Sequence, residues 1–82
     1  MYHALKCWPQ YFTPMEAGQK TFELRKDDRG FCVHDTLRIR EWNPDTERYT
    51  GREVMKEITY ILEGPLMGLD AGWVILGLSH GG

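Results

Sequence analysis

GQKTFELRKDDRGF (residues 18–31) combines the end of a helix, a strand and a charged loop in one short stretch. Gly18 is typical of the residue that follows a helix C-terminus. From Lys20 to Lys26 the chain alternates apolar and polar side chains, which is the pattern of a half-buried strand. Gly30 is expected to adopt a positive φ in the loop that follows. This stretch therefore predicts a helix end, a strand and a tight loop, in that order.

The two faces of the strand over residues 20–26 differ in chemistry. Side chains alternate across a strand, so we expect Phe22 and Leu24 to point into the core. The polar row on the other face consists of Thr21, Glu23 and Arg25. A solvated strand face and the wall of a ligand site are both consistent with such a row.

The rest of the chain is divided into short segments by Gly, Pro and Asp/Asn clusters, which is typical of β structure. Pro9 suits the first turn of a helix, and Pro14 limits that helix to a short or two-part element. Residues 73–79 are apolar on both parities and are expected to be buried from two sides. The tail, residues 80–82, is expected to fray. Strands are predicted over residues 2–8, 20–26, 36–42, 52–62 and 73–79.

These elements predict a single domain, residues 1–82, of the mainly β (α+β) class. A domain of this size has a thin core. An open sheet would leave one side of that core exposed to solvent and the edge strands of the sheet unpaired. We therefore expect the strands to close into a small barrel with the helix covering one end. The aromatic residues predicted in the core are Phe12, Phe22 and Trp73. One face of the strand 52–62 is predicted to carry Val54, Ile58, Tyr60 and Leu62.

Charge and composition restrict the possible partners. The net charge is −2 and the pI is about 5.9, so a broad basic surface for duplex binding is not expected. Any nucleic-acid contact should be local, to a single nucleotide or a loop. No apolar run approaches a membrane span and no secretion leader is recognised, which favours a cytoplasmic protein with no membrane contact. Cys7 and Cys32 are expected to be free thiols.

Metal, phosphate-loop and nucleophile motifs are weak in this chain. The potential soft metal ligands form no CxxC or HxxxH pair, and there is no GxxxxGK[ST] or GxGxxG sequence. Thr21 and Ser79 have no obvious histidine partner in the sequence. We therefore expect no metal and no other cofactor. The soft ligands considered are His3, Cys7, Cys32, His34 and His80.

The polar row of the strand 20–26 can recognise a small polar ligand. A carboxylate and a guanidinium side by side accept and donate hydrogen bonds in a fixed geometry. Lys20, at the mouth of the strand, can stabilise a negative charge. The alternative is a solvated face with a Glu23–Arg25 pair worth less than about 1 kcal/mol.

The motif G-x-K-T-F-E-L-R-K-x-D-R-x-F, with H-x-L-K-x-x-P-x-Y-F before it and V-x-D-x-L-x-I-R-E-W after it, resembles the ASCH domains of the PUA-like superfamily. The likeness covers residues 3–78 and is strongest for a small branch found in bacteria and phages. It implies a five- to six-stranded pseudo-β-barrel with one helix between its first two strands. It also implies a polar cleft lined by the motif GxKxxExR. Here the motif residues are Gly18, Lys20, Glu23 and Arg25.

The resemblance implies two functions for that cleft. ASCH domains are thought to bind RNA or nucleotides, and some are amidohydrolases that deacylate a modified cytidine. The hydrolase lysine matches Lys20, but Glu23 stands at the position of the hydrolase threonine, and no later helix supplies the distant glutamate. Enzymatic activity is therefore uncertain, and we favour a domain that is not an enzyme. In an enzyme, Glu23 would act as the general base and Lys20 would stabilise charge.

Our main hypothesis from the sequence is an RNA- or nucleotide-binding module. Trp8, Tyr11 or Trp42 could stack on a base. An amidohydrolase of a modified nucleoside and a phage–host protein-interaction module remain as alternatives. The arginines 38, 40, 48 and 52 form either a basic strip or a solvated hairpin face. The candidate ligand-binding residues are Trp8, Lys20, Thr21, Glu23, Arg25, Lys26, Arg29 and Trp42.

Overall fold

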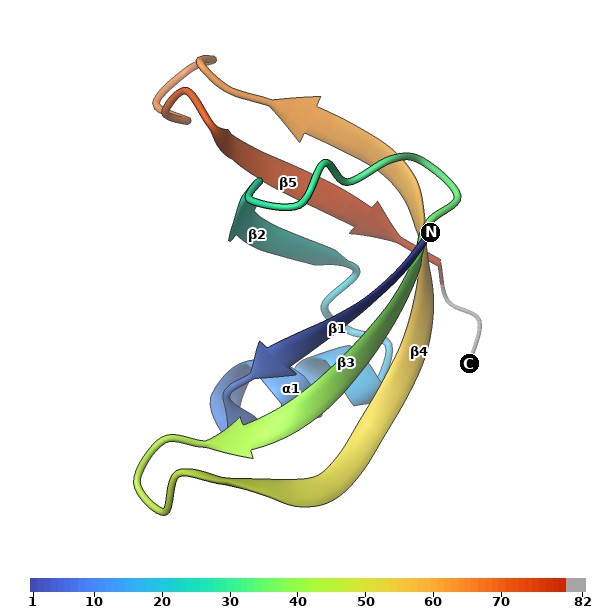
Figure 1. Ribbon diagram of the computed structural model, residues 1–82, viewed down its shortest axis with the longest axis vertical. Coiled ribbons are helices and arrows are strands. Elements are labelled where there is room, and N and C mark those ends of the chain that lie inside the picture. Colours follow the sequence, from blue (N-terminus) through green and yellow to red (C-terminus); the bar gives the residue numbers. More distant parts are fainter. Residues whose placement is uncertain (80–82) are drawn as a thin grey trace.

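The computed structural model describes residues 1–79, in which five strands and one helix are formed (Figure 1). The tail that was expected to fray, with His80, lies outside the described residues. The prediction of a mainly β domain with one short helix between its first two strands is confirmed. The elements are β1 (Tyr2–Cys7), α1 (Pro9–Glu16), β2 (Phe22–Lys26), β3 (Thr36–Asn43), β4 (Arg48–Glu63) and β5 (Trp73–Leu78).

The strands form one mixed sheet in the order β1-β3-β4-β5-β2. β1 runs parallel to β3, and the other neighbouring pairs are antiparallel. β4 serves both halves of the sheet, because it pairs with β3 up to Glu57 and with β5 from Ile58 onward. The sheet bends along β4, so that its two halves form the arms of an open V in Figure 1.

The predicted closure into a barrel is wrong, because β1 and β2 are the two edges of the sheet and do not pair. Arginine side chains cross the space between these edges instead. Arg25 donates from Nη2 to the carbonyl of Lys6, and Arg29 donates from Nη1 to the carbonyl of Ala4 at 2.8 Å. These bonds satisfy edge carbonyls that a closing strand would otherwise have used. The opening between β1 and β2 contains the candidate site.

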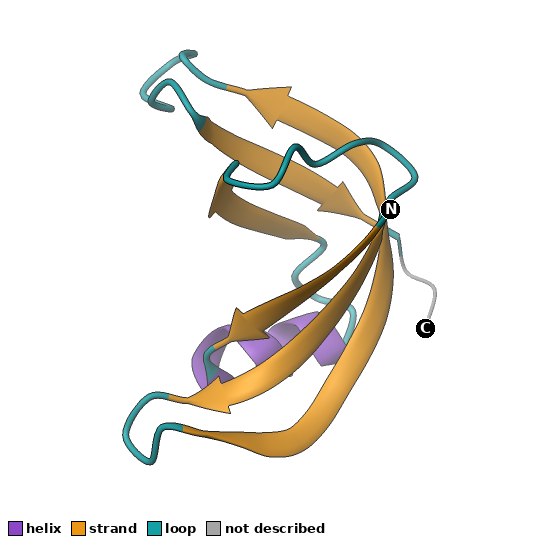
Figure 2. Cartoon of the chain, viewed as in Figure 1, coloured by secondary structure: helices purple, strands orange, loops and turns teal. Residues whose placement is uncertain are grey.

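The core lies on the inner side of the bent sheet, where α1 packs against β3 (Figure 2). Pro9 begins α1 and the helix continues through Pro14 as one short element. Gly18 has φ 80° just beyond the helix, and Gly30 has φ 71°, as the sequence predicted. Phe12 is fully buried, also as predicted. The fully buried large side chains are Leu5, Phe12, Met15, Leu37, Ile39, Ile58 and Leu76.

Several apolar side chains that were predicted in the core lie on the outer face of the sheet. Phe22 and Trp73 are 48% and 38% exposed, and only alternate residues of β5 are buried. A register shift between Ile58 and Tyr60 moves Tyr60 and Leu62 to the face opposite Ile58. The predictions of two-sided burial for residues 73–79 and of one parity for the whole of β4 are therefore wrong.

Candidate functional site

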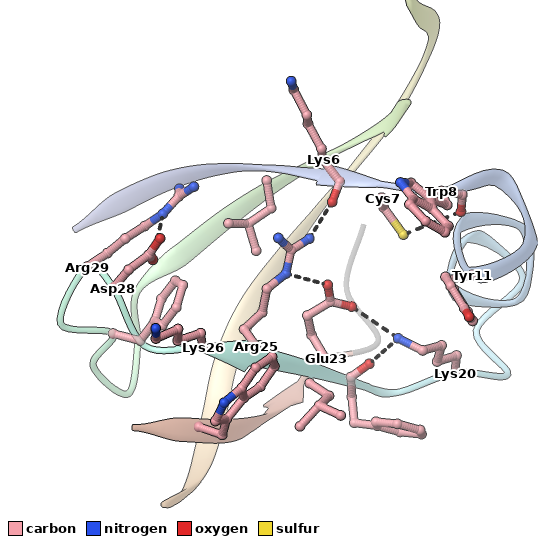
Figure 3. A pocket seen from close by; sticks show the side chains of 15 residues that line it. Lys6, Cys7, Trp8, Tyr11, Lys20, Glu23, Arg25, Lys26, Asp28 and Arg29 are labelled. Carbon is pink, nitrogen blue, oxygen red and sulfur yellow. Dashed lines mark hydrogen bonds and ion pairs between the residues drawn. The ribbon is translucent and has the colours of Figure 1, made fainter. Parts of the chain in front are cut away.

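A pocket of about 830 Å³ opens between β1, β2 and the start of α1 (Figure 3). This volume lies within the range of small-molecule sites, about 300–1,000 Å³. Its polar walls come mainly from β2 and the loop after it. Its charged side chains are Lys20, Glu23, Arg25, Lys26, Asp28 and Arg29, and its aromatic side chains are Trp8, Tyr11, Phe22, Phe31 and Trp73.

β2 turns its polar face inward, which reverses the predicted orientation. Glu23 is 6% exposed, whereas Phe22 and Leu24 are about half exposed. The register explains this reversal, because Glu23 pairs with the buried Leu76 of β5 and cross-strand partners point to the same face. The alternation that the sequence predicted is correct, but the side that faces inward is the polar one.

The Glu23 carboxylate is held by two cations. Lys20 Nζ lies 3.0 Å from one oxygen and Arg25 Nε lies 2.7 Å from the other. Lys20 also donates to the carbonyl of Phe22 at 2.8 Å. Charge-assisted bonds of this kind compensate the burial of a carboxylate. In Figure 3 the three side chains form one chain of contacts that ends on the carbonyl of Lys6.

The loop after β2 is fixed by Asp27. Its Oδ1 accepts backbone N–H groups from Gly30 at 2.8 Å, Phe31 at 3.2 Å and Arg29 at 3.3 Å. Asp27 was not among the predicted residues, although an aspartate three residues before a glycine is typical of a side-chain turn. The loop presents Arg29 to the pocket, where it also lies 3.4 Å from Asp28.

The pocket is positive although the chain is acidic. Without Lys6, four cationic side chains and two carboxylates line it, a local charge of +2 against −2 for the whole chain. Lys6 contributes to the lining too, but its Nζ lies 3.9 Å from the centre of the Trp42 ring and points away from the cavity in Figure 3. The side chain of Lys26 makes no hydrogen bond or ion pair with any other residue in the range 1–79, although its backbone carbonyl accepts a bond from the Asp28 N–H. A local cationic cavity attracts anions without a broad basic surface.

The candidate aromatic residues divide between the two sides of the sheet. Trp8 and Tyr11 border the pocket and are about half exposed. Trp42 is not part of the pocket lining and packs edge-on against Tyr49, with ring centres 4.9 Å apart. Thr21 is exposed and does not line the pocket either. Trp42 and Thr21 are therefore separated from the other predicted site residues, whereas Phe31 and Trp73 join them without having been predicted there.

The predicted basic strip along the β3–β4 hairpin is largely neutralised. Arg38 and Arg40 share the carboxylate of Glu53. Arg52 lies between Glu16 of α1 and the buried Glu41, which are both ion-paired with it. These arginines connect β3 to β4 and β4 to α1. The interpretation as a solvated hairpin face with structural ion pairs is therefore better supported than a basic strip for ligand binding.

Cys7 lies at the inner wall of the pocket and is buried, whereas Cys32 is exposed. Both are free thiols. Burial, followed by the nearby Glu23 carboxylate, raises the pKa of the Cys7 thiol to about 11. The thiol therefore stays protonated at neutral pH and is a poor nucleophile.

Asp35 anchors the loop that carries Phe31. Its carboxylate accepts hydrogen bonds at 2.9 Å from His3 Nε2, the Met1 amine and the Cys32 N–H. These bonds, that from His3 first, hold the pKa of Asp35 well below its ordinary value. The His3 ring packs edge-on against Phe31, 4.9 Å between centres, so the cluster supports the pocket wall from behind.

Replacing Asp35 with asparagine should lower the melting temperature at neutral pH by an amount that shrinks in acid. Because the folded pKa is lowered, the carboxylate stabilises the protein above the unfolded pKa, about 3.9, and that stabilisation is lost as the pH falls through the folded value. Circular-dichroism melts of wild type and Asp35→Asn between about pH 7 and about pH 2 measure the difference. A difference that is constant with pH would contradict this role of the charge.

No helix among residues 1–79 is long and apolar enough to cross a membrane.

Fold and site together define a small, mainly β domain with a cationic, aromatic-walled pocket between the edges of an open sheet. The model of the family described as "Domain of unknown function (DUF3850)" matches residues 2–78, and the chain belongs to this family.

A curated relative comes from a bacteriophage. The chain is 36% identical over 61 residues to a protein of Escherichia phage P2 described as "Uncharacterized 12.9 kDa protein in GpA 3'region". The match covers 74% of this chain and 54% of the phage protein. The chain thus spans about half the length of that relative.

Proposed function

We propose that this domain binds a nucleotide, either free or as an unpaired residue of RNA, in the pocket between β1 and β2. The observation that carries the proposal is a cationic cavity with aromatic walls in a chain whose net charge is negative. Such a cavity offers stacking surfaces for a base and positive charge for a phosphate, which single-stranded nucleic-acid sites combine. The resemblance to ASCH domains of the PUA-like superfamily supports the same assignment.

The contacts in the pocket suggest a role for each group. Lys26, and the N–H groups of Arg29 that Ala4 and Asp28 do not use, are available for a phosphate at the loop end. Trp8 and Tyr11, at the helix end, offer faces for a base. Glu23 uses one lone pair on each oxygen for its cations, and a carboxylate has about four acceptor sites. It can therefore still accept a hydrogen bond from an exocyclic amine of a base.

Deacylation of a modified nucleoside is less well supported. A general base must take up a proton from the reacting group, and both oxygens of Glu23 already accept bonds from Lys20 and Arg25. Binding requires no change in these contacts, whereas base catalysis by Glu23 would require at least one of them to break.

The proposal is tested by titrating tryptophan fluorescence with the four ribonucleoside monophosphates, a short unpaired RNA and a duplex DNA. We expect saturable quenching by at least one monophosphate or by the RNA, and much weaker binding of the duplex. With four cations in the pocket, the slope of log K against log salt should be no steeper than about −3.

A matched pair of tryptophan variants locates the signal. Trp8→Ala should weaken binding because the ring borders the pocket, whereas Trp42→Ala should retain it because that ring lies on the other side of the sheet. If no member of the panel binds saturably, the proposal is overturned. An equal loss of binding affinity in Trp8→Ala and Trp42→Ala would place the ligand elsewhere.

A further inference from the structure

The outer face of β2, β5 and β4 carries a continuous apolar surface. Cross-strand partners share a face, and Gly77 pairs with both Phe22 and Tyr60, while Ile75 pairs with both Leu24 and Leu62. Two rows of side chains therefore cross the three strands next to each other. We name this surface the outer patch, and it consists of Phe22, Leu24, Tyr60, Leu62, Trp73 and Ile75.

The outer patch lies in the upper part of the size range for the largest apolar patch of a monomer, where such patches are often functional. Apart from the partly buried Ile75, its side chains are between 36% and 63% exposed. Large apolar side chains bury roughly 150–250 Å² each when covered, so the patch exposes about 500 Å². The largest patch of a typical monomer is about 300–600 Å² and often functional. A stable interface buries about 800 Å² per partner, which the patch reaches with a modest polar rim.

Two features of the sequence create this patch. Strand β5 is apolar on both parities, yet in residues 1–79 only its inner face, with Val74, Leu76 and Leu78, is buried. The register shift after Ile58 brings Tyr60 and Leu62 to the outer face. Without that shift these side chains would follow the parity of Ile58 into the interior. β5 and the end of β4 thus have the apolar composition of strands that are covered on both faces.

We propose that the outer patch binds the outer patch of a second copy of this chain, forming a two-fold symmetric dimer. Ile75 and Gly77, the middle residues of the two rows, both lie on β5. An isologous interface uses the same patch on both copies, so two outer patches that face each other across a two-fold axis through β5 bury about 1,000 Å² of apolar surface together, which is the size that a specific interface requires.

The dimer is compatible with sheet packing and with an open pocket. Two sheets that pack face to face keep their strands within about 30° of one another and about 10 Å apart, which this axis allows. Glu23 and Arg25 project from the opposite face of β2 into the pocket. Phe22, Leu24 and Trp73 border both the pocket and the outer patch, whereas Tyr60, Leu62 and Ile75 belong to the patch alone. Variants of Tyr60 and Leu62 therefore test the dimer without changing the pocket lining.

Sedimentation equilibrium of the whole chain from about 1 to about 100 µM tests the proposal, because interfaces of this size give micromolar or tighter constants. The expected mass is twice the 9.6 kDa of one chain. Tyr60→Glu and Leu62→Glu, which lie outside the pocket lining, should each raise the dissociation constant at least about 30-fold, as for a central interface residue. Circular dichroism should show that each variant remains folded.

Met55→Glu is the matched control. Met55 is an exposed apolar residue of β4 outside the patch, opposite Arg38 of β3, so its replacement should leave the dimer intact. Arg25→Ala should also remain dimeric, which separates this proposal from the function of the pocket. The proposal would be overturned by a molecular mass of 9.6 kDa throughout the concentration range or by association beyond a dimer. An identical dissociation constant for wild type and Tyr60→Glu would overturn it as well.

Discussion

Replacing Arg25 with alanine should weaken nucleotide binding about 30-fold or more. A hydrogen bond to a charged group contributes about 1.5–3 kcal/mol, and the variant removes both a cation of the pocket and the bond that positions Glu23, the proposed acceptor for a base. Arg25 lines the pocket, positions Glu23 at 2.7 Å and connects β2 to the carbonyl of Lys6. The fluorescence titration described above measures the loss. Arg38→Ala is the matched control, because that arginine pairs with Glu53 outside the pocket.

Arg25→Ala should also destabilise the fold by about 1–3 kcal/mol, since it leaves the buried Glu23 with one cation. The double variant Glu23→Leu/Arg25→Leu separates the two effects. Replacing a buried ion pair by apolar side chains is often neutral for stability, so this variant should regain stability and still fail to bind. Binding by the double variant at the wild-type level would show that the pair has only a structural role.

Replacing Phe12 with alanine should have the largest effect on stability. The ring is fully buried between α1 and the sheet, and Phe→Ala changes in cores cost about 3–5 kcal/mol. An 82-residue chain has a total stability of only about 4–12 kcal/mol. We therefore expect the melting temperature to fall by roughly 15 °C or more, measured by circular dichroism or calorimetry.

The adjacent Tyr11 provides the control for Phe12. Tyr11 is half exposed and borders the pocket, so Tyr11→Ala should change stability by no more than about 0.5 kcal/mol while weakening ligand binding. If Phe12→Ala melts like wild type, the packing of α1 described here is incorrect. If Tyr11→Ala binds normally, the helix end is not part of the ligand site.

Local patterns predicted the elements of this fold well, because each depends on neighbouring residues. Strand alternation, the proline at the start of α1 and the glycines at positive φ act over a few residues. The inward face of β2 depends instead on its register against β5. Alternation defines two faces but does not say which of them is covered, and Glu23 faces inward because Leu76, its partner, does.

The bulge of β4 and the open edges were beyond local patterns for the same reason. The shift between Ile58 and Tyr60 appears only in the pairing with β5. Barrel closure was inferred from the cost of unpaired edges, yet Arg25 and Arg29 satisfy part of the β1 edge with side chains. A side chain that replaces a strand as donor leaves no trace in the hydrophobic pattern.

The motif around β2 did identify residues that the fold brings together. Lys20, Glu23 and Arg25 form one network of ion pairs in the pocket. The same pocket is also lined by Lys26, Arg29 and Trp8. Trp42 was chosen because it precedes a turn, and nearness to a turn does not fix the side of the sheet on which a ring lies. It packs with Lys6 and Tyr49 on the outer side.

The central claim is that the pocket between β1 and β2 binds a nucleotide, and amide chemical-shift mapping tests it most directly. Nitrogen-15-labelled protein is titrated with the monophosphate or RNA that quenches tryptophan fluorescence most strongly. The predicted result is that the largest shifts occur at residues 8–11 and 20–29, around the pocket. The largest shifts at the β3–β4 hairpin around Trp42 and Tyr49, or no shifts with any ligand of the panel, would contradict the claim.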